Sequence, residues 1–302
     1  MSDGRLAVRH AQTQWLDTAY EEYGPEDGDA VILLHGFPYD ARSFDAVAPA
    51  LAAQGCRVIV PYLRGYGETR FRSSWTQRSG QQAAIGGDLS DLIEALAIPK
   101  ALLMGFDWGG RAAAIVAALR PERVRGLVVA GGYQIQDIKA LSGVLPPQVE
   151  HRLWYQTYFN TQRGRDGLAA NRAAFCEHLW RLWSPTWAFS PETYAATAVS
   201  FDNPDFVDVV IHSYRHRCGA APGDPGFEPI ERRLAEKPPI PVPAIALWGA
   251  DDGVMPVPQA DHDAARFTGA YERRILPGVG HNIPQEAPDA VIAALLELRA
   301  AT

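Results

Sequence analysis

Short apolar runs alternate with longer segments in the first 130 residues. The runs are residues 30–35, 57–61, 101–106 and 127–130, and continuous apolar runs of this length are typical of strands buried on both faces of a sheet. The segments between them are expected to form helices at 41–54, 79–97 (with Ser79 as a plausible N-cap) and 109–119. This alternation predicts an α/β fold, with a parallel sheet and helices on both of its faces.

The strand-like runs disappear from about residue 133 to residue 240. The Pro- and Gly-rich stretches at 221–226 and 237–243 would break any helix there. Alternation then resumes, with strands expected at 244–249 and 271–276 and helices at 257–267 and 288–300. We therefore expect residues 1–132 and 241–302 to form one α/β core, and residues 133–240 to form a helical cap.

Composition and charge narrow the classes of partner. The chain has 302 residues, of which 47% are hydrophobic, and a net charge of −7. That charge repels phosphate backbones and anionic lipid surfaces, so we expect neither a nucleic-acid nor a membrane partner. The N-terminus lacks the apolar run of a secretory signal, which favours a cytoplasmic location. Three scattered cysteines indicate no disulfide framework or zinc site, and the pattern does not predict an oligomeric state.

A candidate nucleophile lies between a predicted strand and a predicted helix. Residues 105–109 read GFDWG, with glycines two positions to either side of Asp107. This is the spacing of a nucleophile elbow, where a sharp turn leaves no room for side chains at the flanking positions. Residues 35–38 (HGFP) follow an earlier strand. The backbone N–H groups of Phe37 and Trp108 are expected to form the oxyanion hole.

An acid and a histidine follow two later strands. Asp251 and Asp252 come after the strand at 244–249, and His281 comes after the strand at 271–276. The order nucleophile, acid, histidine is the one expected of α/β-hydrolases. We predict a triad of Asp107, Asp252 and His281, with Asp251 as the alternative acid.

Five motifs together resemble the α/β-hydrolase superfamily: HGFP, PYLRGYGETR, GFDWGG, GADDGV and GVGHNIPQEAP. They are most similar to the branch with an Asp nucleophile, which holds epoxide hydrolases, haloalkane dehalogenases and haloacetate dehalogenases. The resemblance aligns Asp252 with the family acid. It implies an α/β-hydrolase fold, no cofactor, no metal, and a small-molecule substrate that we expect to be an apolar epoxide.

An Asp nucleophile has a distinct chemistry. A carboxylate is already ionised at neutral pH and can attack an sp³ carbon without a base. The product would be an alkyl ester of Asp107. His281, oriented by the acid, would then activate a water molecule that hydrolyses this ester.

The predicted cap supplies candidate residues for the leaving group. Tyr158, in HRLWYQTYFN, resembles the first cap tyrosine of epoxide hydrolases, with Tyr155 as its main rival. Tyr214, in IHSYRHR, resembles the second. Two phenols can donate hydrogen bonds to an epoxide oxygen as its C–O bond breaks. The residues expected to line the substrate pocket are Trp108, Phe37, Pro38 and Trp154.

Dehalogenase chemistry is the alternative. Trp108 also resembles a halide-binding tryptophan, but Phe37 stands where haloalkane dehalogenases often place Asn. Haloacetate dehalogenases hold the substrate carboxylate with two arginines. Arg111 matches one of these, and Trp108 replaces the other. An epoxide hydrolase is therefore the favoured function, and a non-catalytic ligand-binding protein of the same fold is the third hypothesis.

Overall fold

The computed structural model describes residues 7–138 and 143–302, in which nine strands form one sheet. The strand order is β1-β2-β4-β3-β6-β7-β8-β9, with β5 paired to β2. The strands are β1 (Arg9–Gln12), β2 (Leu16–Tyr23), β3 (Asp29–Leu34), β4 (Cys56–Pro61), β5 (Arg70–Phe71), β6 (Ala101–Gly105), β7 (Val124–Ala130), β8 (Ala244–Gly249) and β9 (Tyr271–Leu276). From β4 to β9 every pairing is parallel, whereas β2 runs antiparallel to β1, β4 and β5.

All six predicted strands are confirmed, as β3, β4, β6, β7, β8 and β9. The register of these strands aligns their carboxyl ends. Leu34 of β3 lies opposite Gly105 of β6, and Gly249 of β8 lies opposite Leu276 of β9. The loops that follow these strands therefore leave the same edge of the sheet, which is where ligand sites form in open α/β sheets.

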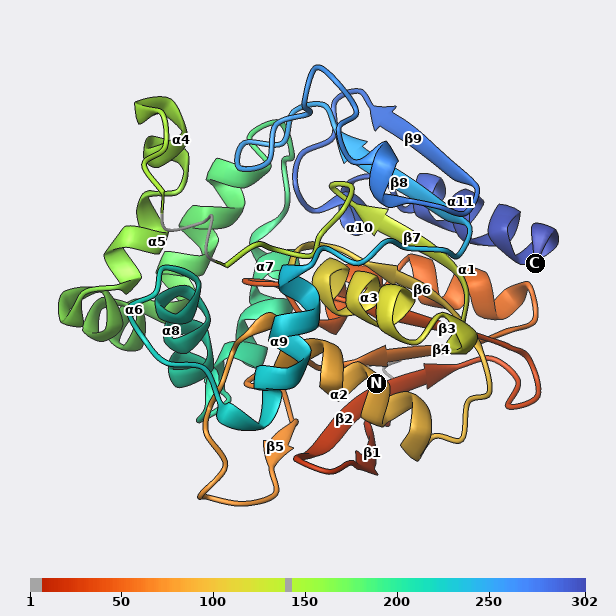
Figure 1. The fold of residues 1–302 in the computed structure, drawn as a ribbon, viewed down its shortest axis with the longest axis horizontal. Coiled ribbons are helices and arrows are strands. Elements are labelled where there is room, and N and C mark those ends of the chain that lie inside the picture. Colours follow the sequence, from red (N-terminus) through yellow and green to blue (C-terminus); the bar gives the residue numbers. More distant parts are fainter. Residues whose placement is uncertain (1–6, 139–142) are drawn as a thin grey trace.

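Helices cover both faces of the sheet (Figure 1). Helices α1 (Val47–Ala53) and α11 (Pro288–Ala301) pack against each other on one face. Helices α2 (Gln82–Ala95) and α3 (Asp107–Leu119) pack together on the other, with α3 against β3, β6 and β7. Helix α3 is rich in alanine and buried along most of its length, which lets it lie close to the sheet.

Three helix predictions need correction. Residues 41–44, expected to form the first turn of a helix over 41–54, form a separate short 3₁₀ turn before α1. Helix α2 starts at Gln82, with Gln81 and not Ser79 as its N-cap, because Arg64 binds the Ser79 carbonyl. Residues 257–267 do not form the predicted helix: only 264–266 make a 3₁₀ turn, and Phe267 bridges Ile240 in an extended conformation.

The segment between β7 and β8 is helical where the structure describes it. It holds α4 (Pro147–Arg152), α5 (Trp154–Phe159), α6 (Gln162–Trp183), α7 (Pro191–Ala198), α8 (Phe206–Arg217) and α9 (Glu228–Ala235). Helices α5, α6 and α8 pack on one another beside the sheet, with α4 at their outer end (Figure 1). Helix α9 lies apart from this group and packs on α2. The segment thus packs in two separate places, beside the sheet and on helix α2.

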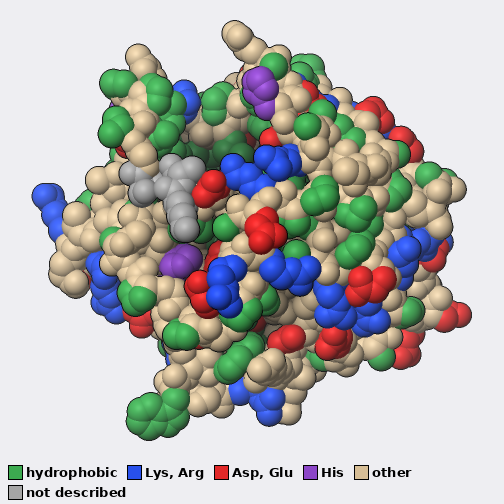
Figure 2. Space-filling view, in the orientation of Figure 1, with side chains coloured by type: hydrophobic (Ala, Val, Ile, Leu, Met, Phe, Trp, Pro, Cys, Tyr) green, Lys and Arg blue, Asp and Glu red, His purple; other side chains and the backbone are tan. Residues whose placement is uncertain are grey.

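The surface carries charges of both signs. On the face drawn in Figure 2, Lys and Arg side chains lie among Asp and Glu side chains, and no single sign dominates. Within the described residues, no helix is both long enough and apolar enough to cross a membrane.

Candidate active site

Asp107 lies at the turn between β6 and α3, as the first residue of the helix. Its φ of +50° is left-handed, a conformation that costs a non-glycine residue roughly 1–2 kcal/mol. Two glycines make the turn possible by close approach. A Cβ on Gly109 would lie 2.1 Å from the Leu34 carbonyl oxygen, and one on Gly105 would lie 2.3 Å from the Gly109 carbonyl oxygen. The GFDWG spacing therefore corresponds to a real steric requirement.

The two predicted oxyanion donors lie beside Asp107. The Phe37 N–H donates a hydrogen bond of 2.9 Å to Asp107 Oδ1. Trp108 follows Asp107 in the first turn of α3, where backbone N–H groups have no partner within the helix. Its nitrogen lies 2.8 Å from the position of a Cβ on Gly36. The backbone N–H groups of Phe37 and Trp108 thus both lie close to Asp107 Oδ1.

The three predicted triad side chains are brought together from segments that follow three different strands, β6, β8 and β9. His281 Nδ1 lies 2.7 Å from Asp252 Oδ2, and His281 Nε2 lies 3.9 Å from Asp107 Oδ2. The other oxygen of Asp252 accepts hydrogen bonds from the Val254 and Met255 amides, at 2.8 and 2.7 Å. The carboxylate is therefore fixed in position, and the structure places Asp252, rather than Asp251, against the histidine.

The protonation of His281 depends on its two acidic neighbours. Burial alone would lower the pKa of His281. The charge and hydrogen bond of Asp252, followed by the charge of Asp107, outweigh burial, and the pKa lies above its ordinary value of 6.5. The ring is 5% exposed, so these charges act with little screening by water.

The end of helix α6 holds the loops that carry the acid and the histidine. The Trp183 carbonyl accepts hydrogen bonds from the Gly253 N–H at 3.0 Å and the His281 N–H at 3.2 Å. Ser184 Oγ also accepts from the His281 N–H, at 3.0 Å, and donates to Glu286. Sequence reasoning did not find this role, since a backbone carbonyl leaves no signal in the side-chain pattern.

Two tyrosines of the helical segment lie beside the groups around Asp107: Tyr214, as predicted, and Tyr155, the alternative to Tyr158. Tyr214 is buried, and its ring centroid lies 5.5 Å from that of Phe37 and 6.1 Å from that of Trp108. Tyr155 lies edge-on to Tyr214, at 5.3 Å. Burial raises the pKa of Tyr155 to about 12, with Arg217 opposing and Asp107 adding to the rise. Burial also raises the pKa of Tyr214, again with a contribution from Asp107.

The expected placement of Tyr158 and Trp154 at the substrate pocket is wrong. The Tyr158 ring stacks on Phe175 of α6, and its hydroxyl lies 2.2 Å from the position of a Cβ on Gly167. Trp154 packs on the same side of α5, against Tyr158 and Phe175. In a helix, positions four apart share a face, so 154 and 158 point toward α6 while 155 points toward Tyr214 of α8. The rival tyrosine, Tyr155, is the one that faces the site.

An aromatic wall closes the site over Asp107. Trp183 contacts His281 and Tyr155 edge-on or tilted, both at 5.2 Å, and Phe159 contacts Phe37 at 6.1 Å. Pro38 is buried in this wall, and its carbonyl accepts a hydrogen bond of 2.8 Å from Trp180. The spacing of tryptophans at 180, 183 and 187 fits core packing equally well, so the pattern did not single out Trp183.

The cavity at the triad is small. It is lined by Asp107, Asp252 and His281 together with residues of the neighbouring loops, and its volume is about 10 Å³. That is roughly the space one water molecule needs. A small organic substrate needs more space than this cavity offers, so side chains around Asp107 would have to move. Within the described residues, no cluster of three or more His, Cys, Asp or Glu side chains could hold a metal ion.

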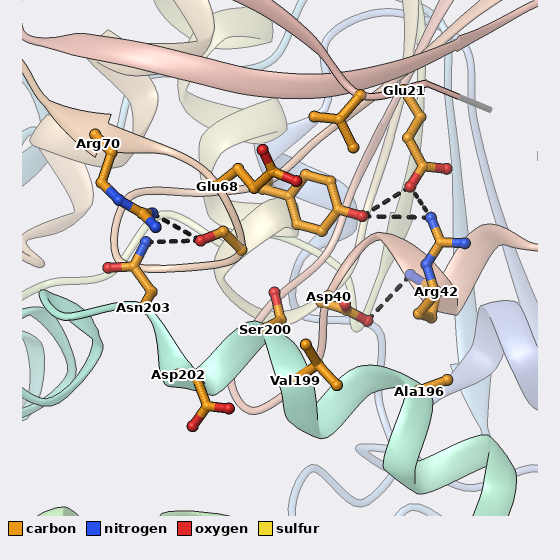
Figure 3. A pocket seen from close by; sticks show the side chains of 13 residues that line it. Glu21, Asp40, Arg42, Glu68, Arg70, Ala196, Val199, Ser200, Asp202 and Asn203 are labelled. Carbon is orange, nitrogen blue, oxygen red and sulfur yellow. Dashed lines mark hydrogen bonds and ion pairs between the residues drawn. The ribbon is translucent and has the colours of Figure 1, made fainter. Parts of the chain in front are cut away.

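A larger cavity of about 370 Å³ lies away from the triad, between the loop after β4 and the 3₁₀ turn at Val199–Asp202 (Figure 3). Its two arginines are already engaged: Arg42 with Glu21, and Arg70 with the Gly67 carbonyl. No triad residue lines it. Geometry and chemistry therefore point to the small cavity at Asp107, despite its size.

Known proteins share this architecture. A family model described as alpha/beta hydrolase fold matches residues 29–288. The crystal structure of a candidate epoxide hydrolase from Klebsiella pneumoniae is 48% identical, with a TM-score of 0.95 and 97% of each chain covered. Epoxide hydrolase B of Mycobacterium tuberculosis is 33% identical over 152 residues, or 46% of this chain and 42% of that protein. Epoxide hydrolase 4 of Mus musculus is 24% identical over 278 residues, or 90% of this chain and 73% of that protein.

The alignment with the Mycobacterium tuberculosis protein spans less than half of that relative's length. The family match, in contrast, extends on both sides of the helical segment. It includes the segments that carry Asp107, Asp252 and His281. The chain therefore belongs to the α/β-hydrolase family, and within this family of hydrolases it is most similar to epoxide hydrolases.

Proposed function

We propose that this hydrolase opens an epoxide to a vicinal diol through an ester on Asp107. The observation that carries the proposal is the position of Tyr155 and Tyr214. These two buried phenols contact the aromatic rings around the candidate nucleophile, and its charge acts on both of them. A leaving alkoxide needs hydrogen-bond donors or a proton, and the two phenols can supply both.

In the first step, Asp107 Oδ2 attacks an epoxide carbon and the C–O bond breaks. Oδ1 is engaged by the Phe37 N–H, so Oδ2 is the oxygen left for attack. The epoxide oxygen takes a proton from Tyr155 or Tyr214. A phenol with a pKa of about 12 stays protonated at neutral pH, yet it is far more acidic than water, whose pKa is ~15.7, and can protonate an alkoxide.

In the second step, His281 activates a water molecule that attacks the ester carbonyl. The cavity beside Asp107 and His281 has room for one water. The oxyanion forms at Oδ1, where the Phe37 and Trp108 amides can stabilise it. Asp252 stabilises the imidazolium. The tetrahedral intermediate collapses, its alkoxide takes the proton of the hydroxyl that came from water, and the diol leaves with the Asp107 carboxylate restored. The imidazolium then returns its proton to the phenolate, which restores His281 and the tyrosine. We propose that residues 133–240 act as the lid over this site, and that Trp108, Phe37 and Pro38 line the substrate pocket.

One observation favours a dehalogenase as the second candidate. The Trp108 indole N–H is buried next to Asp107 and has no hydrogen-bond partner in the described part of the chain. Such a donor could stabilise a halide leaving group, which needs no proton. The nucleophile and the base would act in the same way.

The experiment is a parallel assay of aryl and alkyl epoxides, haloalkanes and haloacetates, read as diol formation against halide release. We expect diol from an epoxide. Tyr155→Phe and Tyr214→Phe should each slow diol formation by roughly 10²-fold, by analogy with the loss of one oxyanion donor. Tyr158→Phe is the matched control on the same helix, and we expect it to retain near-normal turnover. Halide release with no diol, or insensitivity to both substitutions, would overturn the proposal.

A further inference from the structure

Two buried arginines of the site have no part in the steps above. Arg111 lies on α3, one turn after Asp107, and Arg217 ends α8, almost one turn after Tyr214. Each residue is only 5% exposed. A guanidinium group carries a permanent charge and five N–H donors, and its burial is unfavourable unless acceptors or anions surround it.

Neither arginine is satisfied by the described residues. The Nε atoms of Arg111 and Arg217 are both buried without a hydrogen-bond partner. The one ion pair that either makes there joins Arg111 to Asp107, at 3.7 Å, which is too long for a hydrogen bond. Arg64 shows the contrast: equally buried, it makes two bonds of 2.6 Å to Asp88 and one of 2.7 Å to the Ser79 carbonyl.

The two cations belong to the same space as the candidate nucleophile. The Arg217 guanidinium lies over the Tyr214 ring, 4.9 Å from its centroid. Burial lowers the pKa of Arg111, and the charge of Arg217 lowers it further, to about 10. The charges of both arginines also act on Tyr155 and Tyr214. The groups thus surround one region between α3, α5 and α8.

The charges of this region do not balance. Arg111 and Arg217 contribute two positive charges, and Asp107 contributes one negative charge. Asp252 is already engaged with His281. Once Asp107 becomes an ester its charge is lost, while the phenol that protonates the epoxide oxygen becomes a phenolate. Among the described residues, the two buried cations therefore still face a single negative charge. A substrate that brings its own negative charge would restore the balance throughout the reaction.

We propose that Arg111 and Arg217 form a subsite for a carboxylate, and that the substrates are therefore small epoxides bearing a carboxylate group. The inference rests on the proposed function and replaces the expected apolar epoxide. Guanidinium groups match a planar carboxylate through paired N–H donors. The carboxylate takes no part in bond making: Asp107 bonds to an epoxide carbon, the C–O bond breaks, the oxygen gains a phenol proton, and the product is a dihydroxy acid.

The test compares 2,3-epoxypropanoate with its uncharged isostere 2,3-epoxypropanamide. We expect wild-type kcat/KM to favour the acid by at least about 100-fold, because the amide leaves the buried cations uncompensated. Arg217→Met keeps the apolar stem and removes the charge, and should lower this acid-to-amide ratio at least about 10-fold, mainly through KM. Arg215→Met is the matched control. It removes a charge from the same helix, where Arg215 binds the carbonyls of Phe159 and Thr161, and should keep the ratio.

Binding without turnover gives a second measurement, which also applies if Arg217→Met does not fold. Propanoate should inhibit wild type competitively at concentrations at least about 10-fold below those of propanamide. Equal use of acid and amide, both giving diol, would overturn the subsite and leave the proposed function intact. Halide release from chloroacetate but not from chloroacetamide, with no diol from any epoxide, would keep the subsite and overturn the epoxide function.

Discussion

The two carboxylate oxygens of Asp107 have different surroundings. Oδ1 accepts the Phe37 N–H, whereas Oδ2 faces His281 and Arg111 at 3.9 and 3.7 Å. One oxygen can therefore stay in the oxyanion hole through both steps while the other forms and loses the bond to substrate. This division of roles requires the left-handed turn at Asp107, because the turn points the side chain back toward the HGFP loop.

His281→Gln should separate the two chemical steps. Attack by Asp107 needs no base, whereas attack by water does. We expect the ester on Asp107 to accumulate, which intact-protein mass would detect as one substrate equivalent after brief exposure to an epoxide. Asp107→Ala is the control and should gain no mass. An unmodified His281→Gln protein with full turnover would contradict the assignment.

The charge of Asp107 should be visible in the titration of His281. Burial lowers the pKa of His281, while the charges of Asp252 and Asp107 raise it above 6.5. Asp107→Asn removes one negative charge, so the histidine should titrate at a lower pH than in wild type. Ring-proton NMR would measure both midpoints. Esterification of Asp107 removes the same charge, so it should also lower the pKa of His281. The histidine would then be neutral over a wider pH range at the step that needs a base. Hydrolysis of the ester should therefore speed up as pH rises through this lower pKa. Equal midpoints would refute the coupling.

At the scale of elements, the strand-to-helix turn tolerates little change. Gly109→Ala would place a Cβ 2.1 Å from the Leu34 carbonyl oxygen, so β3 and α3 would have to separate. We expect the free energy of unfolding to fall by about 3 kcal/mol or more, at the upper end of overpacking costs. Gly110→Ala is the matched control on the next residue, where the nearest contacts are 3.3 Å, and it should change stability far less. Chemical denaturation of both variants would measure the difference.

Strands buried on both faces could be predicted from the sequence, whereas at the edges of the sheet only β9 was predicted. The other five predicted strands are largely apolar runs. β2 instead contains Glu21, a buried acid whose partners Arg42 and Tyr62 lie far away in the sequence. The predicted helix at 257–267 lies between prolines and is extended where Phe267 bridges Ile240. Local pattern carries no information on such distant partners.

The same limit applies to the candidate site. Asp107, Asp252 and His281 follow strands, and strand ends can be located from the pattern. Tyr155 and Tyr158 differ only in which side of a short helix they occupy. That side is set by the packing of α5 between α6 and α8, and the periodicity of six residues does not specify it.

At the scale of the whole molecule, Ser184 couples α6 to the histidine loop. Its hydroxyl accepts from the His281 N–H and donates to Glu286. Ser184→Ala should lower the free energy of unfolding by about 1–3 kcal/mol, because the buried His281 N–H and the Glu286 carboxylate each lose a partner. It should also slow ester hydrolysis more than ester formation. Ser190→Ala is the control: it removes the N-cap of α7, at a cost of about 1 kcal/mol, without touching the histidine loop. Equal effects of both variants on single-turnover hydrolysis would argue against the coupling.

The Trp183 carbonyl, which accepts from both Gly253 and His281, bears on how the enzyme could be re-engineered. A chimera made by exchanging residues 133–240 with the corresponding segment of a relative would also exchange the Trp183 carbonyl. The loops that carry the acid and the histidine in the host protein would then lose their common hydrogen-bond acceptor. Such a chimera could gain a new substrate pocket and still misplace His281, if the carbonyl of the residue that replaces Trp183 lies in a different position. Functional transplants should therefore end before α6 reaches Trp183, or else carry the loops at 249–254 and 279–286 with them.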